Sequence, residues 1–155
     1  MAEKFKSYNK EIPVKSNRTS NPTEETIIDK SNTPERPDGY VAQVHSIYIS
    51  QVSNDKFEGL ERYNPKNFSA FNLYIDEGEQ SNNKIYIVYD GRIVPGSPFF
   101  IEKNITLESN QRLVIECPTD SRDINTDTNQ IVSLNTDTNV KLHISASAVL
   151  FPTAS

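Results

Sequence analysis

The chain of 155 residues contains few of the residue types on which disulfides, zinc sites and glycine-rich loops depend. It has no tryptophan, one methionine, five glycines, two histidines and one cysteine, Cys117. A single cysteine excludes an intrachain disulfide and a zinc site built from Cys-x-x-Cys pairs. Since tryptophan is absent, the core must be built from Ile, Val, Leu, Phe and Tyr.

Long apolar segments are also missing. No run approaches the roughly 20 apolar residues of a membrane-spanning helix, and the first segment, MAEKFKSYNKEIPVKSNRTS, lacks the apolar centre of a signal peptide. We therefore expect a protein that is made and folded in the cytosol, with no membrane partner. The formal net charge of -5 provides no general attraction for nucleic acid, so we expect no specific binding to it.

Reactive side chains are not grouped as an active site would require. His45 and His143 lie within alternating segments without the spacing of metal ligands. Cys117 shares one face of its segment with aliphatic residues, which favours a core position over a nucleophile. The acids of YIDEGE (74–79) end a strand at Gly78 and are better explained as a solvated turn than as a pair of catalytic carboxylates. We expect no enzymatic activity, cofactor or metal.

The five residues NTDTN occur twice, at 125–129 and 135–139. Asp123, Asn125 and Asp127 alternate as the first ligands of a calcium loop would. However, Thr128 stands where such a loop has Gly, and Leu134 where it has a bidentate Glu. Asn, Asp and Thr are common turn formers, so we interpret both copies as turns on either side of the short strand QIVSL (130–134).

From Val41 onward, apolar and polar residues alternate, which predicts half-buried β-strands. In KIYIVYD (84–90), for example, the alternation places Ile85, Ile87 and Tyr89 on one face. The expected strands are VAQVHSIYISQV (41–52), FSAFNLYIDE (68–77), KIYIVYD (84–90), FFIEKNITL (99–107), QRLVIEC (111–117), QIVSL (130–134) and NVKLHISASAVLF (139–151). The expected core residues are Phe71, Leu73, Ile75, Ile85, Ile87, Leu113, Ile115, Leu142 and Ile144.

Turn-forming clusters separate these segments, and no helical pattern extends beyond a turn or two. Seven short strands without helical crossovers imply antiparallel pairing. The sequence therefore predicts an all-β fold, an antiparallel β-sandwich or jelly-roll-like domain over residues 41–155.

Residues 1–40 differ from the rest in composition. They contain four prolines and few large apolar residues, so we expect an extended N-terminal arm that is disordered until assembly. A solvated tail is the alternative. An arm that orders on a neighbouring subunit would use Phe5, Tyr8, Ile12, Val14, Ile27 and Ile28 as anchors. On this hypothesis, deletion of residues 1–36 leaves a folded β domain that no longer enters particles.

The C-terminal half carries a resemblance. A strand ending NITL is followed by a polar turn, the strand RLVIE, a loop, a short strand, NTDTNVKLHISAS and a final aliphatic strand. The pattern covers about residues 41–151, most specifically 99–151, and it resembles the small β-sandwich structural proteins of tailed bacteriophages, which occur in head, neck and tail assemblies. The resemblance implies a virion protein without catalytic residues that contacts copies of itself and other virion proteins.

A carbohydrate- or receptor-binding module is the alternative function. Such a module would use exposed tyrosines on a sheet or at loop tips. The candidates are Tyr48, Tyr63, Tyr74, Tyr86 and Tyr89, although tyrosine is also an ordinary strand residue.

Overall fold

The computed structural model describes residues 3–13, 23–53, 69–77, 83–93, 97–117, 123–125, 130–132 and 140–153, and these contain strands and turns but no helix. Within them, no helix is long and apolar enough to cross a membrane. The strands are β1 (Lys4–Pro13), β2 (Thr23–Ile28), β3 (Tyr40–Ser53), β4 (Ser69–Asp76), β5 (Lys84–Ile93), β6 (Phe99–Ile101), β7 (Ile105–Leu107), β8 (Arg112–Cys117), β9 (Asp123–Asn125), β10 (Gln130–Val132) and β11 (Val140–Pro152).

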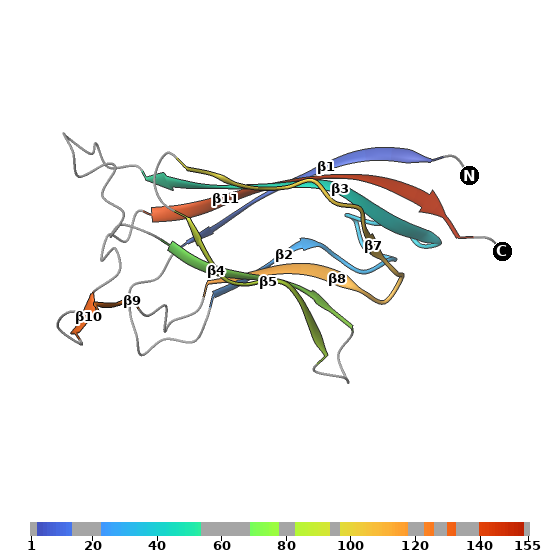
Figure 1. Ribbon diagram of the computed structural model, residues 1–155. Helices are drawn as coiled ribbons and strands as arrows, with labels where there is room; N and C mark the ends of the chain where they lie inside the picture. Colours follow the sequence, from blue (N-terminus) through green and yellow to red (C-terminus); the bar gives the residue numbers. More distant parts are fainter. Residues whose placement is uncertain are drawn as a thin grey trace.

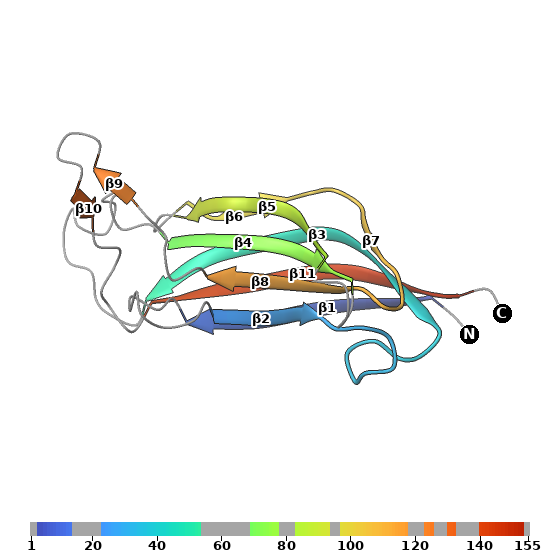
Figure 2. The same cartoon turned by 90° about the horizontal axis from the view of Figure 1, so that it is seen from below.

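The long strands form two antiparallel sheets that pack face to face, as Figure 1 shows. The first sheet has the order β1-β11-β3-β6, and β7 also pairs with β3. The second has the order β2-β8-β4-β5. Figure 2 shows the strands of both sheets running along the long axis of the molecule, with the chain termini at one end and the β9–β10 hairpin at the other. The expected all-β antiparallel sandwich is confirmed.

The strand pairs are nested within one another. β4 pairs with β5, β3 with β6 and β7, β2 with β8, and β1 with β11. A ribbon of nested antiparallel pairs wrapped into two sheets is the jelly-roll topology. The strand opposite β3 is interrupted at residues 102–104, so that β6 and β7 pair with its two halves.

Apolar residues at alternate strand positions fill the space between the sheets. Along β11, for instance, Leu142, Ile144 and Ala146 point inward and are fully buried. Among the expected core residues, those buried in this cluster are Phe71, Leu73, Ile75, Leu113, Ile115, Leu142 and Ile144. Ile87 is partly buried and packs against the cluster. Ile85 does not belong to it, because its place near the start of edge strand β5 leaves the side chain 47% exposed.

The expectation of a separate N-terminal arm is wrong for the described part of residues 1–40. β1 pairs with β11 along its whole length, and β2 pairs with β8. Of the expected arm anchors, Tyr8, Ile12, Ile27 and Ile28 are buried in the chain's own core. The boundary near Tyr40 therefore does not divide an arm from a sandwich.

The remaining two anchors have other positions. Phe5 is 84% exposed on the outer side of β1, and Val14 lies outside the described residues. The prolines do not keep this part of the chain out of the sheets. Pro34 and Pro37 lie in the connection between β2 and β3, and Pro13 is the last residue of β1, so none of these interrupts a strand.

A buried arginine fastens the connection between β2 and β3 to the turn before β8. Arg36 is fully buried. Its Nη1 donates to the carbonyl of Leu107 at 2.9 Å, and its Nη2 donates to the carbonyl of Gln111. Burial lowers the pKa of the Arg36 guanidinium. Its Nε has no hydrogen-bond partner in the described part of the chain.

The NTDTN copies lie almost entirely outside the described residues. Between them, Gln130–Val132 forms β10 and pairs with Asp123–Asn125 in a short hairpin. The remaining residues of both copies, 126–129 and 135–139, are not described.

Candidate functional site

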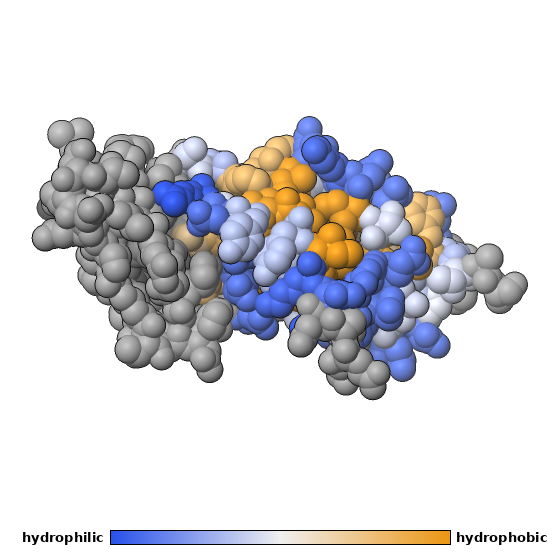
Figure 3. Space-filling model, turned by 60° about the horizontal axis from the view of Figure 1, so that its bottom comes forward, coloured by the Kyte–Doolittle hydropathy of each residue, from blue (hydrophilic) through white to orange (hydrophobic). Residues whose placement is uncertain are grey.

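Three tyrosines gather on the outer face of the second sheet, at its β4–β5 edge. The ring centroids of Tyr74 and Tyr86 are 5.7 Å apart, and those of Tyr86 and Tyr89 are 5.1 Å apart. Tyr74 is buried beneath its neighbours, whereas Tyr86 is 43% and Tyr89 is 72% exposed. We call Tyr74, Tyr86 and Tyr89 the tyrosine cluster. Figure 3 shows this side of the molecule, where apolar residues gather centrally among hydrophilic ones.

A β-bulge brings Tyr86 and Tyr89 to the same face. Residues three apart on a regular strand point to opposite faces. Here Leu73 pairs with Val88 while Tyr74 pairs with Tyr86, so the residue between, Ile87, has no partner in the register. Such a bulge redirects the side chains that follow it.

The bulge also corrects the expected facing of β5. Alternation placed Tyr89 beside Ile85 and Ile87, but in the structure Ile87 and Val88 both pack against the core and Tyr89 joins Tyr86 outside. A sequence signal for this irregularity was present. Asp90-Gly91 is a turn-forming pair within a strand pattern, and a glycine there often marks a bulge.

A second irregularity at the same place is held by Asn72, which has no residue opposite it on β5. Its Oδ1 accepts a hydrogen bond from the backbone N–H of Asp90 at 2.8 Å, and its Nδ2 donates to Oε1 of Glu116 at 3.1 Å. Asp90 has a positive φ of 55°. A Cβ added at Gly91 would lie 2.6 Å from the Phe71 ring, so this position needs glycine.

Charged groups surround the buried tyrosine. The Tyr74 hydroxyl donates to Oε1 of Glu24 at 3.0 Å. Burial, reinforced by that hydrogen bond, raises the pKa of Tyr74. Lys84 Nζ lies 4.7 Å from the centre of the Tyr74 ring, 3.5 Å from Glu116 Oε2 and 3.8 Å from Glu24 Oε1. Desolvation favours the neutral amine of Lys84, but the Glu116 carboxylate and other neighbouring groups outweigh it and raise its pKa.

The same outer face continues into a polar hollow at the far end of β4 and β8. Arg112 donates from Nε and Nη2 to Oδ2 of Asp76 at 2.8 and 2.6 Å, and from Nη1 to Oγ1 of Thr26 at 3.0 Å. Asp29 and Lys30 complete the lining of this hollow of about 300 Å³. Two of its four charged side chains, Arg112 and Asp76, pair with each other.

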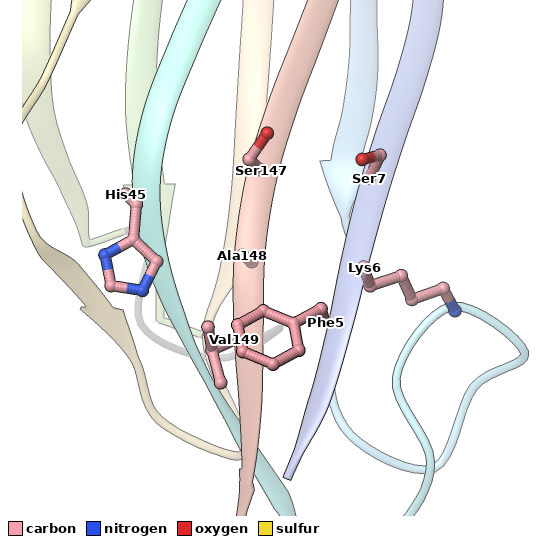
Figure 4. A pocket seen from close by; sticks show the side chains of 7 residues that line it. All are labelled: Phe5, Lys6, Ser7, His45, Ser147, Ala148 and Val149. Carbon is pink, nitrogen blue, oxygen red and sulfur yellow. The ribbon is translucent and has the colours of Figure 1, made fainter.

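The outer face of the first sheet has a different character. Figure 4 shows a shallow hollow in which Phe5 from β1 lies next to Val149 from β11, with His45 from β3 on the other side. The His45 Nδ1 is 2.9 Å from Oδ1 of Asn104. Lys6, Ser7, Ser147 and Ala148 complete the lining of this hollow.

The expected tyrosine surface is thus divided. Tyr48 lies on the outer face of the first sheet, 6.3 Å from Phe100 between ring centroids. Tyr63 lies outside the described residues. Of the expected tyrosines that the structure describes, Tyr74, Tyr86 and Tyr89 come together. Tyr74 and Tyr86 are opposite each other in the register, and the bulge adds Tyr89 to them.

The cysteine and the two histidines lie on strands of the sandwich. Cys117 is buried, and burial raises the pKa of its thiol to about 12. His45 and His143 lie on β3 and β11. In the described ranges, no three His, Cys, Asp or Glu side chains form a group that could hold a metal ion.

Comparison with known proteins identifies no family. No family model and no curated protein matches the sequence. Among solved structures, the chain is similar to the CBM22-1 xylan-binding domain of Xyn10C from Paenibacillus barcinonensis. The two share 7% identity with a TM-score of 0.35, over 99% of this chain and 88% of that one. A likeness at this level carries no information about ligands.

Proposed function

We propose that this chain is a non-enzymatic structural protein of a tailed-bacteriophage virion, a component of the head, neck or tail. It is made in the host bacterial cytoplasm and contacts copies of itself and other virion proteins. The observation that carries the proposal is the order of strands and turns over residues 99–151, which resembles small β-sandwich virion proteins.

The surface of the sandwich is consistent with such contacts. Large apolar side chains are exposed on the outer faces of both sheets, among them Phe5, Tyr48 and Phe100 on the first and Tyr86 and Tyr89 on the second. Aromatic residues are enriched in protein interfaces. Jelly rolls serve as capsid and lectin domains, but a fold does not determine a function, so that comparison is an analogy only.

In this proposal, copies of the chain contact one another through the faces and edges of the sandwich, not through an N-terminal arm that orders on a neighbouring subunit. β1 and β2 already pair within their own chain. Contacts between copies therefore involve surfaces that are exposed once these strands are in place.

The test is the location of the chain in purified particles. The phage that encodes it is grown, and DNA-filled particles are separated from lysate on a density gradient. We expect the full chain in the particles at a constant ratio to the major capsid protein, measured by quantitative peptide mass spectrometry, and antibody labelling at one fixed site in electron micrographs. A chain found only in the soluble lysate would contradict the proposal.

A further inference from the structure

We infer that the outer face of the second sheet binds one uncharged pyranose unit of a glycan at Tyr86 and Tyr89. This binding function does not depend on a place in the virion. It rests on the ring geometry of the tyrosine cluster, on the groups that hold those rings and on the charges beside them.

The ring geometry sets the size of the ligand. Tyr86 and Tyr89 meet at an interplanar angle of 86° with centroids 5.1 Å apart. Two perpendicular rings cannot both stack on successive sugars of a flat chain. One ring is the platform for the apolar C–H face of a pyranose, and the other is a wall at its edge. Tyr89, the more exposed of the two at 72%, is the platform.

The Tyr86 and Tyr89 rings are held in place before any ligand binds. Tyr86 packs against Tyr74, whose hydroxyl is fixed by Glu24 and whose ring lies beneath Lys84. Tyr89 lies between the bulge at Ile87 and the second irregularity, which Asn72 holds by accepting a hydrogen bond from the Asp90 N–H. Tyrosine side chains have only two rotatable angles, and a preorganised site loses less entropy on binding.

Hydrogen-bonding groups lie next to Tyr74, the buried ring of the tyrosine cluster. The Lys84 and Glu24 side chains are 37% and 44% exposed. They provide donors and acceptors for sugar hydroxyls, which need both. Together with Glu116, these three groups carry one positive and two negative charges. The excess negative charge disfavours acidic sugars, so the ligand is a neutral one.

A protein partner is the less favourable occupant of this surface. A stable interface buries about 800 Å² on each partner and is depleted of charge at its centre. Here Lys84 and Glu24 contact Tyr74 beside the two exposed rings. Asp90, which directly follows Tyr89 in the chain, forms an ion pair with Arg92 at 3.5 Å. Charged groups this close to two rings suit a single sugar better than a broad apolar contact.

The experiment uses the full chain and the methyl pyranosides of glucose, galactose, mannose and N-acetylglucosamine, with methyl glucuronide as the charged counterpart. Saturation-transfer NMR reports which sugar protons touch the protein, and ¹⁵N chemical-shift mapping reports where. We expect transfer to the ring C–H protons of at least one neutral sugar, little transfer to the glucuronide, and shifts confined to β4, β5 and their neighbours.

Variants separate stacking from general effects. Tyr89→Ala should weaken binding about fivefold or more, given the energy of aromatic contacts, while Tyr89→Phe should retain it. Tyr48→Ala is the control, because that tyrosine is also exposed and also meets another aromatic ring edge-on, but it lies on the other sheet. Circular dichroism checks the fold of each variant.

Four outcomes would overturn the inference: no transfer to any neutral sugar, chemical shifts that map to the first sheet, equal losses in Tyr89→Ala and Tyr48→Ala, or retention of another virion protein at this face without sugar binding. Where a variant fails to fold, the shift map of the unaltered chain decides between support and refutation. The result is independent of whether the chain is found in particles, so the two proposals fail separately.

Discussion

Arg36 offers the sharpest test of how the β2–β3 connection is held, and we predict that Arg36→Met destabilises the fold. The substitution keeps most of the aliphatic stem and removes the guanidinium. It therefore removes the hydrogen bonds to the carbonyls of Leu107 and Gln111, which link residues 71 and 75 positions apart in the chain. Stem packing is preserved, so the loss reports mainly on these polar links.

The magnitude follows from opposing contributions. A hydrogen bond from a charged group contributes about 1.5–3 kcal/mol, so two contribute roughly 3–6 kcal/mol. The variant also relieves the cost of burying a charge and an unpartnered Nε, which offsets about 1–3 kcal/mol. We expect a net loss of roughly 2–3 kcal/mol, which is a large part of the roughly 5–15 kcal/mol of a typical domain. At about 2–4 °C per kcal/mol, Tm should fall by roughly 4–12 °C.

The assay is urea unfolding followed by far-UV circular dichroism, with calorimetry for Tm. Lys103→Met is the control, because it removes a cation from an exposed position and should change stability by less than about 0.5 kcal/mol. Hydrogen exchange should increase first in β7 and in the part of β3 that pairs with it. A variant whose free energy of unfolding lies within about 0.5 kcal/mol of the parent's would refute this role of the two Arg36 hydrogen bonds.

Gly91, Cys117, the N-terminal strands and the NTDTN copies each offer a further test. Gly91→Ala should cost about 1–3 kcal/mol, because its Cβ would meet the Phe71 ring; an unchanged Tm in calorimetry would show that the ring yields. Cys117 should react slowly with a thiol reagent in the native state and fast in denaturant, and rapid native labelling would contradict its burial. Because burial raises the pKa of the Cys117 thiol from 9.0 to about 12, stability should decline as pH rises between these values; a Cys117→Ala variant should show a shallower decline in urea midpoint, and an identical profile would remove the thiol as the cause. Deletion of residues 1–36 should leave an unfolded or aggregating chain by circular dichroism and size-exclusion chromatography, since it removes two sheet strands; a folded monomer would restore the arm hypothesis. A chelator should leave Tm unchanged if the NTDTN copies are turns, whereas a drop of several degrees would indicate a bound cation.

Local alternation was sufficient to predict the strands at the centre of the fold. The faces of β4, β8 and β11 follow directly from their own residues, because successive strand side chains point to opposite sides whatever the partner. The lack of helical periodicity likewise settled the all-β class. Leu113 and Ile115 are buried, as their two-residue spacing requires.

The tertiary structure alone decided which segments complete the sheets. β1 and β2 are poor in apolar residues, and their few buried side chains, such as Tyr8 and Ile12, gain their burial from β11 at the opposite end of the chain. No local pattern encodes such a partner. By composition alone, residues 1–40 therefore look like an arm. Four of the side chains expected to dock on a neighbouring subunit are instead buried in the core of their own chain.

The tyrosine cluster has the same origin. Tyr86 and Tyr89 would face opposite ways on a regular strand, and only the register of β5 against β4 turns them to one side. Arg36 is likewise charged and proline-flanked in sequence but fully buried in the fold. The sequence by itself determined the central strands and the inward faces of β4, β8 and β11, since these depend on neighbours in the chain. The edges, the bulge and the buried cation depend on contacts between distant residues, and those exist only once the sheets have formed.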